Sequence, residues 1–359
     1  MIYLDYQATT PLAPEAREAM LYWLGGPDSD GFANPHSSHR AGRATAAAVE
    51  FAREQVASLL PAGGRVVFTS GATEAINLAI AGSGAQRIAV SAIEHAAVMD
   101  TARAIDPGTH VISADAEGLV DPDIAIPGGI DLVAVMQVNN EIGTIQPVEA
   151  LAKRVHAARA LFLCDAVQGA GKLEAPTEAD LIAISAHKLY GPKGIGALWV
   201  RDGIALSPQM RGGGQEQGLR SGTLSPALCA GFGAAAMLAK QRINADAEHV
   251  ARLWGKARGM LGRWQLNGSE AHRWLGNLNL CLPGLDAARL MSDLRGIALS
   301  AGSACASGSG RPSHVLRAIG LSDAEAKASI RLGFGRYTSP GEFEDACAKI
   351  DAAAMAQGV

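Results

Sequence analysis

Residues 161–200 read LFLCDAVQGAGKLEAPTEADLIAISAHKLYGPKGIGALWV, and this stretch decides the fold class. It holds three short apolar runs in which apolar and polar residues do not alternate strictly. Such runs are typical of strands that are buried on both faces of a sheet. Runs of this kind occupy residues 66–68, 88–90, 131–138, 161–163, 180–184 and 195–200.

Helical periodicity fills several of the intervals between these runs. Apolar residues recur every three or four positions in residues 49–59, and again in residues 148–158. This spacing puts the apolar side chains on one face of a helix. Strands that alternate with helices predict an α/β fold with a large, mainly parallel sheet.

The pattern changes after about residue 225. An alanine-rich helical stretch is followed by strand candidates at 277–282 and 297–300 and then by further helices. A chain of 359 residues exceeds the usual size of one compact core. We therefore expect a large α/β domain over residues 11–245 and a smaller α+β domain formed by residues 1–10 and 246–359.

Two late helices carry start signals. Ser322 precedes Glu325 by three residues, and Ser339 precedes Glu342 by the same spacing. Both pairs have the form of a capping box, in which the serine accepts a hydrogen bond from the third helical amide and the glutamate reaches back.

Charge and composition exclude several classes of partner. The formal net charge is −4, which provides no basic field to attract nucleic acid or anionic lipid. No apolar run approaches membrane-spanning length, and the first residues lack the features of a secretion signal. These features predict a cytoplasmic protein that acts on small substrates or proteins, without nucleic acid or membrane as a partner.

The five cysteines are scattered and include no Cys-x-x-Cys pair, which argues against a disulfide framework and against a metal site. Four of them lie in apolar stretches and are expected to be buried. Cys305 differs because it lies in the small-residue loop SAGSACASGSG, residues 300–310. Such a loop is poorly suited to core packing, so an accessible thiol is expected there.

The loop TSGATE, residues 69–74, joins a predicted buried strand to a predicted helix. The unpaired amides and the dipole of a helix start favour phosphate, and the hydroxyl of Thr73 adds a donor. Taken alone, the segment is more typical of a serine or threonine that caps a helix.

Lys188 directly follows another predicted buried strand and precedes a glycine-rich turn. Desolvation at such a position lowers the pKa of an amine and prepares it for Schiff-base chemistry, with Ser185 and His187 as nearby polar groups. A solvated lysine at a strand end is the alternative interpretation.

Other strands are also followed by polar residues. Asp165 and Gln168 follow one strand, Asn140 a second and His95 a third. Ligands gather at the carboxyl ends of parallel strands in open α/β sheets. A buried acid at this edge suits a pyridinium nitrogen, for which aspartate is a common partner.

With these residues in place, the sequence resembles the cysteine desulfurases of the NifS/IscS type, which are fold type I pyridoxal-phosphate enzymes of the class V aminotransferase family. The resemblance runs through nearly the whole chain. The matching segments are residues 3–11, 34–39, 69–74, 94–95, 138–143, 165–168, 185–196, 212–223 and 300–307.

The resemblance implies a role for each matching residue. Lys188 corresponds to the lysine that carries pyridoxal 5'-phosphate, His95 to the residue that stacks on its ring, and Asp165 to the partner of the ring nitrogen. Phosphate and ring contacts are implied for Ala72, Thr73, Asn140, Gln168, Ser185, His187 and Thr223.

The resemblance further implies that Cys305 takes sulfur from L-cysteine as a persulfide and that alanine is released. Arg331 corresponds to the arginine that binds the substrate carboxylate, and Asn140 and Asn34 are expected to contact the substrate. Thr223 is expected to reach the cofactor of a second subunit, which predicts a homodimer. The implied sulfur acceptor is a protein such as an iron-sulfur scaffold.

Two alternatives share the fold. A selenocysteine lyase would use the same cofactor but would barely respond to cysteine. A non-catalytic partner protein would keep the fold and the dimer, although such a chain is expected to have lost at least one of the residues that carry the chemistry.

Overall fold

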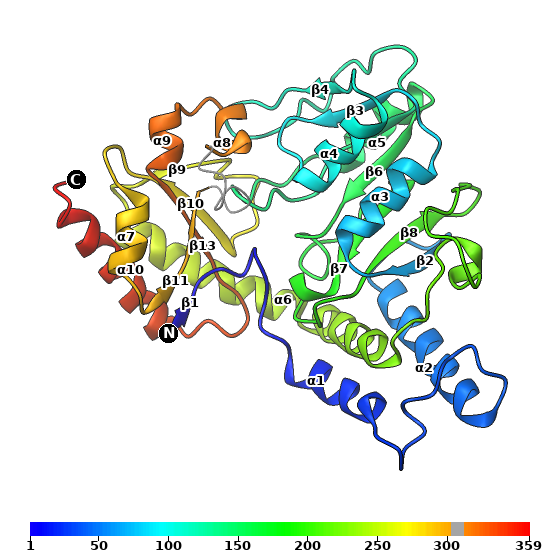
Figure 1. Cartoon of the computed structure of the whole chain (residues 1–359). Helices are drawn as coiled ribbons and strands as arrows, with labels where there is room; N and C mark the ends of the chain where they lie inside the picture. Colours follow the sequence, from blue (N-terminus) through cyan, green and yellow to red (C-terminus); the bar gives the residue numbers. More distant parts are fainter. Residues whose placement is uncertain (303–311) are drawn as a thin grey trace.

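The computed structural model describes residues 1–302 and 312–359, and its largest element is a seven-stranded sheet (Figure 1). The strand order across this sheet is β2-β8-β7-β6-β5-β3-β4. Its strands are β2 (Gly64–Thr69), β3 (Ile88–Ser91), β4 (His110–Ile112), β5 (Leu132–Ala134), β6 (Leu161–Asp165), β7 (Leu181–Ser185) and β8 (Gly196–Arg201).

Four consecutive pairings in this sheet, from β7 to β4, are parallel, and β8 runs antiparallel to both of its neighbours. The prediction of a mainly parallel sheet is thus confirmed. The predicted run at 131–138 forms a strand only over Leu132–Ala134. The carboxyl ends of β2, β3, β5, β6 and β7 lie at one edge of the sheet, which is where polar residues were expected to gather.

Helices cover both faces of the sheet. The side chains of Leu181 and Ala183 point to the cluster under α3 (Ala72–Gly82) and α4 (Ala96–Ile105). Those of Ile182 and Ile184 point to the opposite cluster, under α2, α5 and the first half of α6. Because both faces are covered, β7 is apolar at its first four positions instead of alternating, and only its last residue, Ser185, is polar.

The remaining helices of this part contain the predicted helical stretches, except α1, which was not predicted from the sequence. They are α1 (Pro14–Leu21), α2 (Arg40–Ala57), α5 (Val148–Ala157) and α6 (Pro226–Met260).

A smaller four-stranded antiparallel sheet, in the order β12-β13-β10-β9, forms the second part of the molecule. Strand β1 (Ile2–Tyr3) pairs separately with β11 (Ile297–Ala298). The predicted strand at 297–300 is therefore two short strands in different sheets. The other elements are β9 (Gln265–Leu266), β10 (Asn277–Cys281), β12 (Ser300–Ala301), β13 (Ser329–Gly333), α7 (Ala287–Asp293), α8 (His314–Ala318), α9 (Asp323–Lys327) and α10 (Pro340–Met355).

Helix α6 connects the two parts (Figure 1). Its first half packs Phe232 and Ala236 into the core beneath the large sheet. Its second half packs Val250 and Leu253 into the core of the smaller sheet. The helix continues through the predicted domain boundary at residue 245, and that boundary stays a prediction.

Both predicted helix starts are present. Ser322 and Glu325 make the two reciprocal bonds of a capping box at α9. At α10, Ser339 accepts a bond from the amide of Glu342, and no return bond from the glutamate is found within the described ranges.

Cys164, Cys229, Cys281 and Cys347 are buried, as expected, and Cys305 lies outside the described residues. In the described part of the chain, no helix is long and apolar enough to cross a membrane.

Candidate active site

A cavity of about 600 Å³ opens at the carboxyl edge of the seven-stranded sheet, and side chains from the smaller sheet complete its wall. It brings together most of the residues that the sequence predicted. The predicted residues that line it are Ala72, Thr73, His95, Asn140, Asp165, Gln168, Ser185, His187, Lys188 and Arg331.

Among the described residues, two that were predicted are not in this lining. Asn34 is exposed, and its side-chain oxygen accepts a bond from the amide of His36. Thr223 is also exposed. The assignment of Cys305 falls in the part of the chain that is not described, so its place relative to the cavity is not given.

Helix α3 begins at the cavity without a side-chain cap. Its N-cap residue is Gly71, which has no side chain to accept a hydrogen bond from the amides of the first turn. The amide of Ser70 instead donates to the Glu74 carboxylate at 2.7 Å. The alternative of a serine or threonine cap is therefore wrong, and the start of the helix is left to bind an anion.

Gly196 allows the loop before α3 and strand β8 to approach each other. A Cβ atom at this position would lie 2.7 Å from the Cα atom of Gly71. Any larger residue would push the loop away from the sheet edge.

Lys188 lies at the end of a single 3-10 turn, Ala186–Lys188, that follows strand β7. Its ammonium donates to the carbonyl oxygen of Gln7 and to that of Ala8, the latter at 2.8 Å. Lys188 is half-buried, so its amine is held by the residue 7–8 carbonyls while part of the side chain still contacts solvent. Burial, together with the charge of Lys188, lowers the pKa of His187 to about 4, so this imidazole is neutral at physiological pH.

Asp165 ends strand β6 and is 5% exposed. Burial raises the pKa of its carboxyl, and the nearby His95 and Lys188 oppose that shift. Gln168, three residues further on, donates its amide to the Gln7 carbonyl at 2.9 Å. Its side-chain oxygen is buried and has no hydrogen-bond partner among the described residues.

His95 caps helix α4, where its Nδ1 accepts the amide of Ala97 at 3.1 Å. Burial lowers the pKa of this imidazole, so the neutral form is favoured. Because Nδ1 is an acceptor, the proton of the neutral ring lies on Nε2.

Glu94 precedes His95 in the matching segment 94–95; it was not predicted as a site residue, and it does not line the cavity. It is fully buried, and Ser91 Oγ and the amide of Met136 donate to one of its carboxylate oxygens. Burial raises the pKa of Glu94 to about 8. The sequence feature that could have drawn attention to it is a glutamate in the segment SAIEH, residues 91–95.

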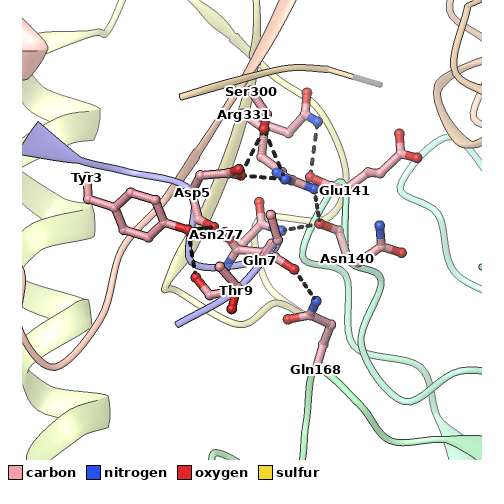
Figure 2. Close-up of polar contacts among 12 residues, drawn as sticks. Tyr3, Asp5, Gln7, Thr9, Asn140, Glu141, Gln168, Asn277, Ser300 and Arg331 are labelled. Atoms are coloured by element: carbon pink, nitrogen blue, oxygen red, sulfur yellow. Dashed lines mark hydrogen bonds and ion pairs between the residues drawn. The ribbon is translucent and has the colours of Figure 1, made fainter. Parts of the chain in front are cut away.

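Arg331 lies in the middle of strand β13, and only 1% of its side chain is exposed. The guanidinium donates to Asp5 at 2.7 Å and to the carbonyl of Asn140 at 2.9 Å. Ser300 also donates to Asp5, so the three side chains form one network (Figure 2). Asp5 was missed as a site residue because its partner is 326 positions away.

Gln7 joins this network to the lysine side of the cavity. Its side-chain nitrogen donates to the Gly276 carbonyl at 2.9 Å, and its backbone carbonyl accepts the bond from Gln168 seen in Figure 2. The first ten residues thus lie between the two sheets at the cavity.

Comparisons with known proteins agree with this geometry. The sequence profile described as "Aminotransferase class-V" matches residues 2–345. The "Cysteine desulfurase IscS" of Shewanella piezotolerans is 42% identical, over 97% of this chain and 91% of its own length.

Two solved structures are also similar. A "NIFS-LIKE PROTEIN" superimposes with a TM-score of 0.89 and 30% identity, over 98% of both chains. "SspA in complex with cysteine" superimposes with a TM-score of 0.82 and 34% identity, over 94% of this chain and all of that chain. The chain therefore belongs to the class-V aminotransferase family, and within it to the NifS/IscS-type cysteine desulfurases.

Proposed function

We propose that this chain converts L-cysteine to L-alanine with bound pyridoxal 5'-phosphate and passes the sulfur to its own Cys305. The main support for this proposal is that one cavity is lined by Lys188, the buried Asp165, the uncapped start of α3 and the buried Arg331. A similar protein, SspA, has been solved with cysteine, which supports this substrate.

The cavity fits pyridoxal phosphate on features of the chain itself. The uncapped start of α3 suits the phosphate, with Ala72, Thr73, Ser185 and His187 around it. Burial disfavours the charge of Asp165, and a protonated ring nitrogen would restore it. The unpartnered oxygen of Gln168 and the side chain of Asn140 remain for the other polar atoms of the ring and for the substrate.

In this proposal, residues of the chain itself accept and transfer the protons. The cofactor supplies an electron sink when the substrate loses its Cα proton. Lys188 would accept this proton at Nζ, and the Gln7 and Ala8 carbonyls would stabilise the ammonium. His95, which lines the same cavity, would contact the cofactor ring and move a proton through Nε2.

Arg331 binds the substrate carboxylate in this proposal. Its fork is fixed by Asp5 and by the Asn140 carbonyl, and its Nε has no partner within the described ranges. A planar guanidinium pairs two carboxylate oxygens at once. Asn140 and Asn34 are the further substrate contacts that we propose.

Sulfur transfer balances without an added oxidant. The Cys305 thiolate attacks the sulfur of bound cysteine, so an S–S bond forms as the C–S bond breaks. The electron pair of the C–S bond goes to Cβ, where a proton completes alanine. Cys305 is left as a persulfide, and a protein such as an iron-sulfur scaffold accepts the outer sulfur.

We further propose that the active form is a cytoplasmic homodimer. Thr223 is exposed at the end of the segment 212–223, which is tied to the start of α3 by the ion pair of Arg220 with Glu74 at 2.7 Å. A second copy would place this threonine at the partner's phosphate.

The test is alanine and sulfide release from L-cysteine with a reductant, for the wild-type protein, Lys188→Ala and Cys305→Ser. We expect activity in the wild type alone. Turnover at full rate by Cys305→Ser would remove the persulfide assignment.

Release of alanine from selenocysteine but not from cysteine would indicate a selenocysteine lyase. A wild-type protein that binds no cofactor would indicate a non-catalytic partner protein.

A further inference from the structure

Thr10 contacts the turn that carries Lys188, although it lies 177 positions before His187. Its hydroxyl donates to the His187 carbonyl at 2.9 Å and accepts the amide of Tyr190 at 2.8 Å. Its own amide donates to the same His187 carbonyl at 2.9 Å. One side chain, 4% exposed, thus binds the backbone on both sides of Lys188.

The turn itself has little local support. It is a single 3-10 turn of three residues, and the side chain of its N-cap residue, Ser185, makes no capping bond within the described part of the chain. Tyr190, two residues after Lys188, has a φ of 69°, in the left-handed region that a bulky side chain rarely adopts. Such a conformation persists only where the surrounding structure imposes it.

The remaining contacts of Tyr190 come from distant segments as well. Its hydroxyl accepts the amide of Arg336 at 2.9 Å, and the guanidinium of Arg336 lies 4.1 Å from the centre of the ring. Its carbonyl accepts the amide of Ala13 at 2.9 Å. These contacts fix the ring and the carbonyl, whereas the amide that faces Lys188 is fixed by Thr10.

The same segment also binds the ammonium of Lys188. The carbonyls of Gln7 and Ala8 accept from Nζ, and Thr10 follows two residues later. Residues 7–10 therefore bind both the backbone of residues 186–190 and the side-chain amine of Lys188.

We propose that Thr10 is a positioning residue, whose hydroxyl fixes the turn 186–190 so that Lys188 presents its amine for covalent capture of the cofactor. The inference rests on the proposed function for that last step. Loss of the hydroxyl would leave the buried Tyr190 amide without an acceptor, which favours relaxation of φ to negative values and displacement of Lys188.

The decisive variants are Thr10→Val, which keeps the shape and removes the hydroxyl, and Thr10→Ser, which restores it. Thr45→Val is the matched control, because Thr45 is also buried and its hydroxyl donates to the Gly42 carbonyl at 2.9 Å within helix α2. If Thr10→Val does not fold, Thr10→Ala removes the hydroxyl without a bulky branch and gives the same comparison.

The first measurement is amide hydrogen exchange of residues 186–191 in the full-length protein without pyridoxal phosphate. We expect Thr10→Val to speed exchange about tenfold, the size expected from losing a buried hydrogen bond. Thr10→Ser and Thr45→Val should match the wild type. Unchanged exchange in Thr10→Val, or equal acceleration in Thr10→Ser, would overturn the proposal.

The second measurement is the rate at which added pyridoxal phosphate becomes borohydride-trappable at Lys188, read by peptide mass. Capture by Thr10→Val should be slower by about tenfold, with kcat reduced and KM for cysteine unchanged. Normal capture in a variant with fast exchange would overturn the link to Lys188. A wild-type protein that captures no cofactor would refute the proposed function, and hydrogen exchange still decides whether Thr10 holds the turn.

Discussion

The two walls of the cavity differ in how the cost of burying a charged group is offset. The first wall, at the edge of the seven-stranded sheet, carries Asp165, and Glu94 is buried in the core outside the lining. Burial raises the pKa of both carboxyls because it disfavours their charge. The second wall carries Arg331, which is also buried but is paired directly with Asp5. Burial thus raises the pKa of the carboxyls on one side, whereas on the other side a direct ion pair compensates the buried charge.

The walls also differ in how they hold their cations. Arg331 is in the middle of a strand, and its register against Asn279 and Ser300 fixes its position. Lys188 ends a three-residue turn that depends on residues 7–10. A residue in a sheet takes its position from the backbone ladder, whereas a residue in a turn needs distant side chains.

The largest expected effect comes from removing the cation of the second wall. Arg331→Ala should lower kcat/KM for cysteine by about 100-fold or more, chiefly through KM, because a charged bidentate contact is lost. Steady-state alanine release measures this. Arg331→Lys should recover only part of the loss, and an unchanged KM would mean that the carboxylate binds elsewhere.

In the core beside the first wall, protonation of Glu94 should appear as a pH dependence of stability. The folded pKa of about 8 lies above the ordinary value of 4.5, so the folded state binds the proton more tightly. The stabilisation of the folded state by the proton on Glu94 is fully present below about pH 4.5 and is lost as pH rises through 8. Glu94→Gln should therefore become more stable relative to the wild type, by about 4 kcal/mol between pH 5 and pH 8.5.

Denaturant unfolding at the two pH values measures the difference for Glu94→Gln. Glu149→Gln is the control, because the Glu149 carboxylate accepts from the amides of Thr177 and Glu178 near the surface. If the difference in unfolding free energy between the wild type and Glu94→Gln does not change with pH, Glu94 is ionised in the folded protein.

A smaller effect is expected from weakening the ion pair of the second wall. Asp5→Asn keeps the shape but removes the charge that holds the guanidinium, so KM for cysteine should rise by about five- to tenfold. Substrate titration of alanine release measures it. A fall in KM would mean that Asp5 competes with the substrate for Arg331.

The smallest effect is expected from Ser300, whose hydroxyl donates to Asp5 at 2.8 Å. Ser300→Ala removes one neutral donor, so KM should rise by only about two- to threefold. Ser329→Ala is the matched control, because this buried serine lies on β13 and donates to the Glu325 carbonyl. Equal effects of the two variants would assign the change to the sheet instead of to the network.

The sequence predicted the first wall better than the second. Lys188, Asp165 and His95 each follow an apolar run, and parallel strands bring such ends to one edge. The partners Asp5, Gln7 and Thr10 could not be predicted in the same way, because their contacts lie in segments far apart in the chain. Glu94 was visible as a strand-end acid, but its protonation depends on burial that the sequence does not specify.

The sequence by itself determined the α/β class, the buried strands and the edge at which polar residues gather, because apolar periodicity and strand order are local properties. Only the tertiary structure decided that residues 1–10 cross between the two sheets and hold both Arg331 and Lys188. It also decided that α3 starts without a cap. These features depend on contacts between distant segments, and such contacts form only once the sheets and α6 are packed.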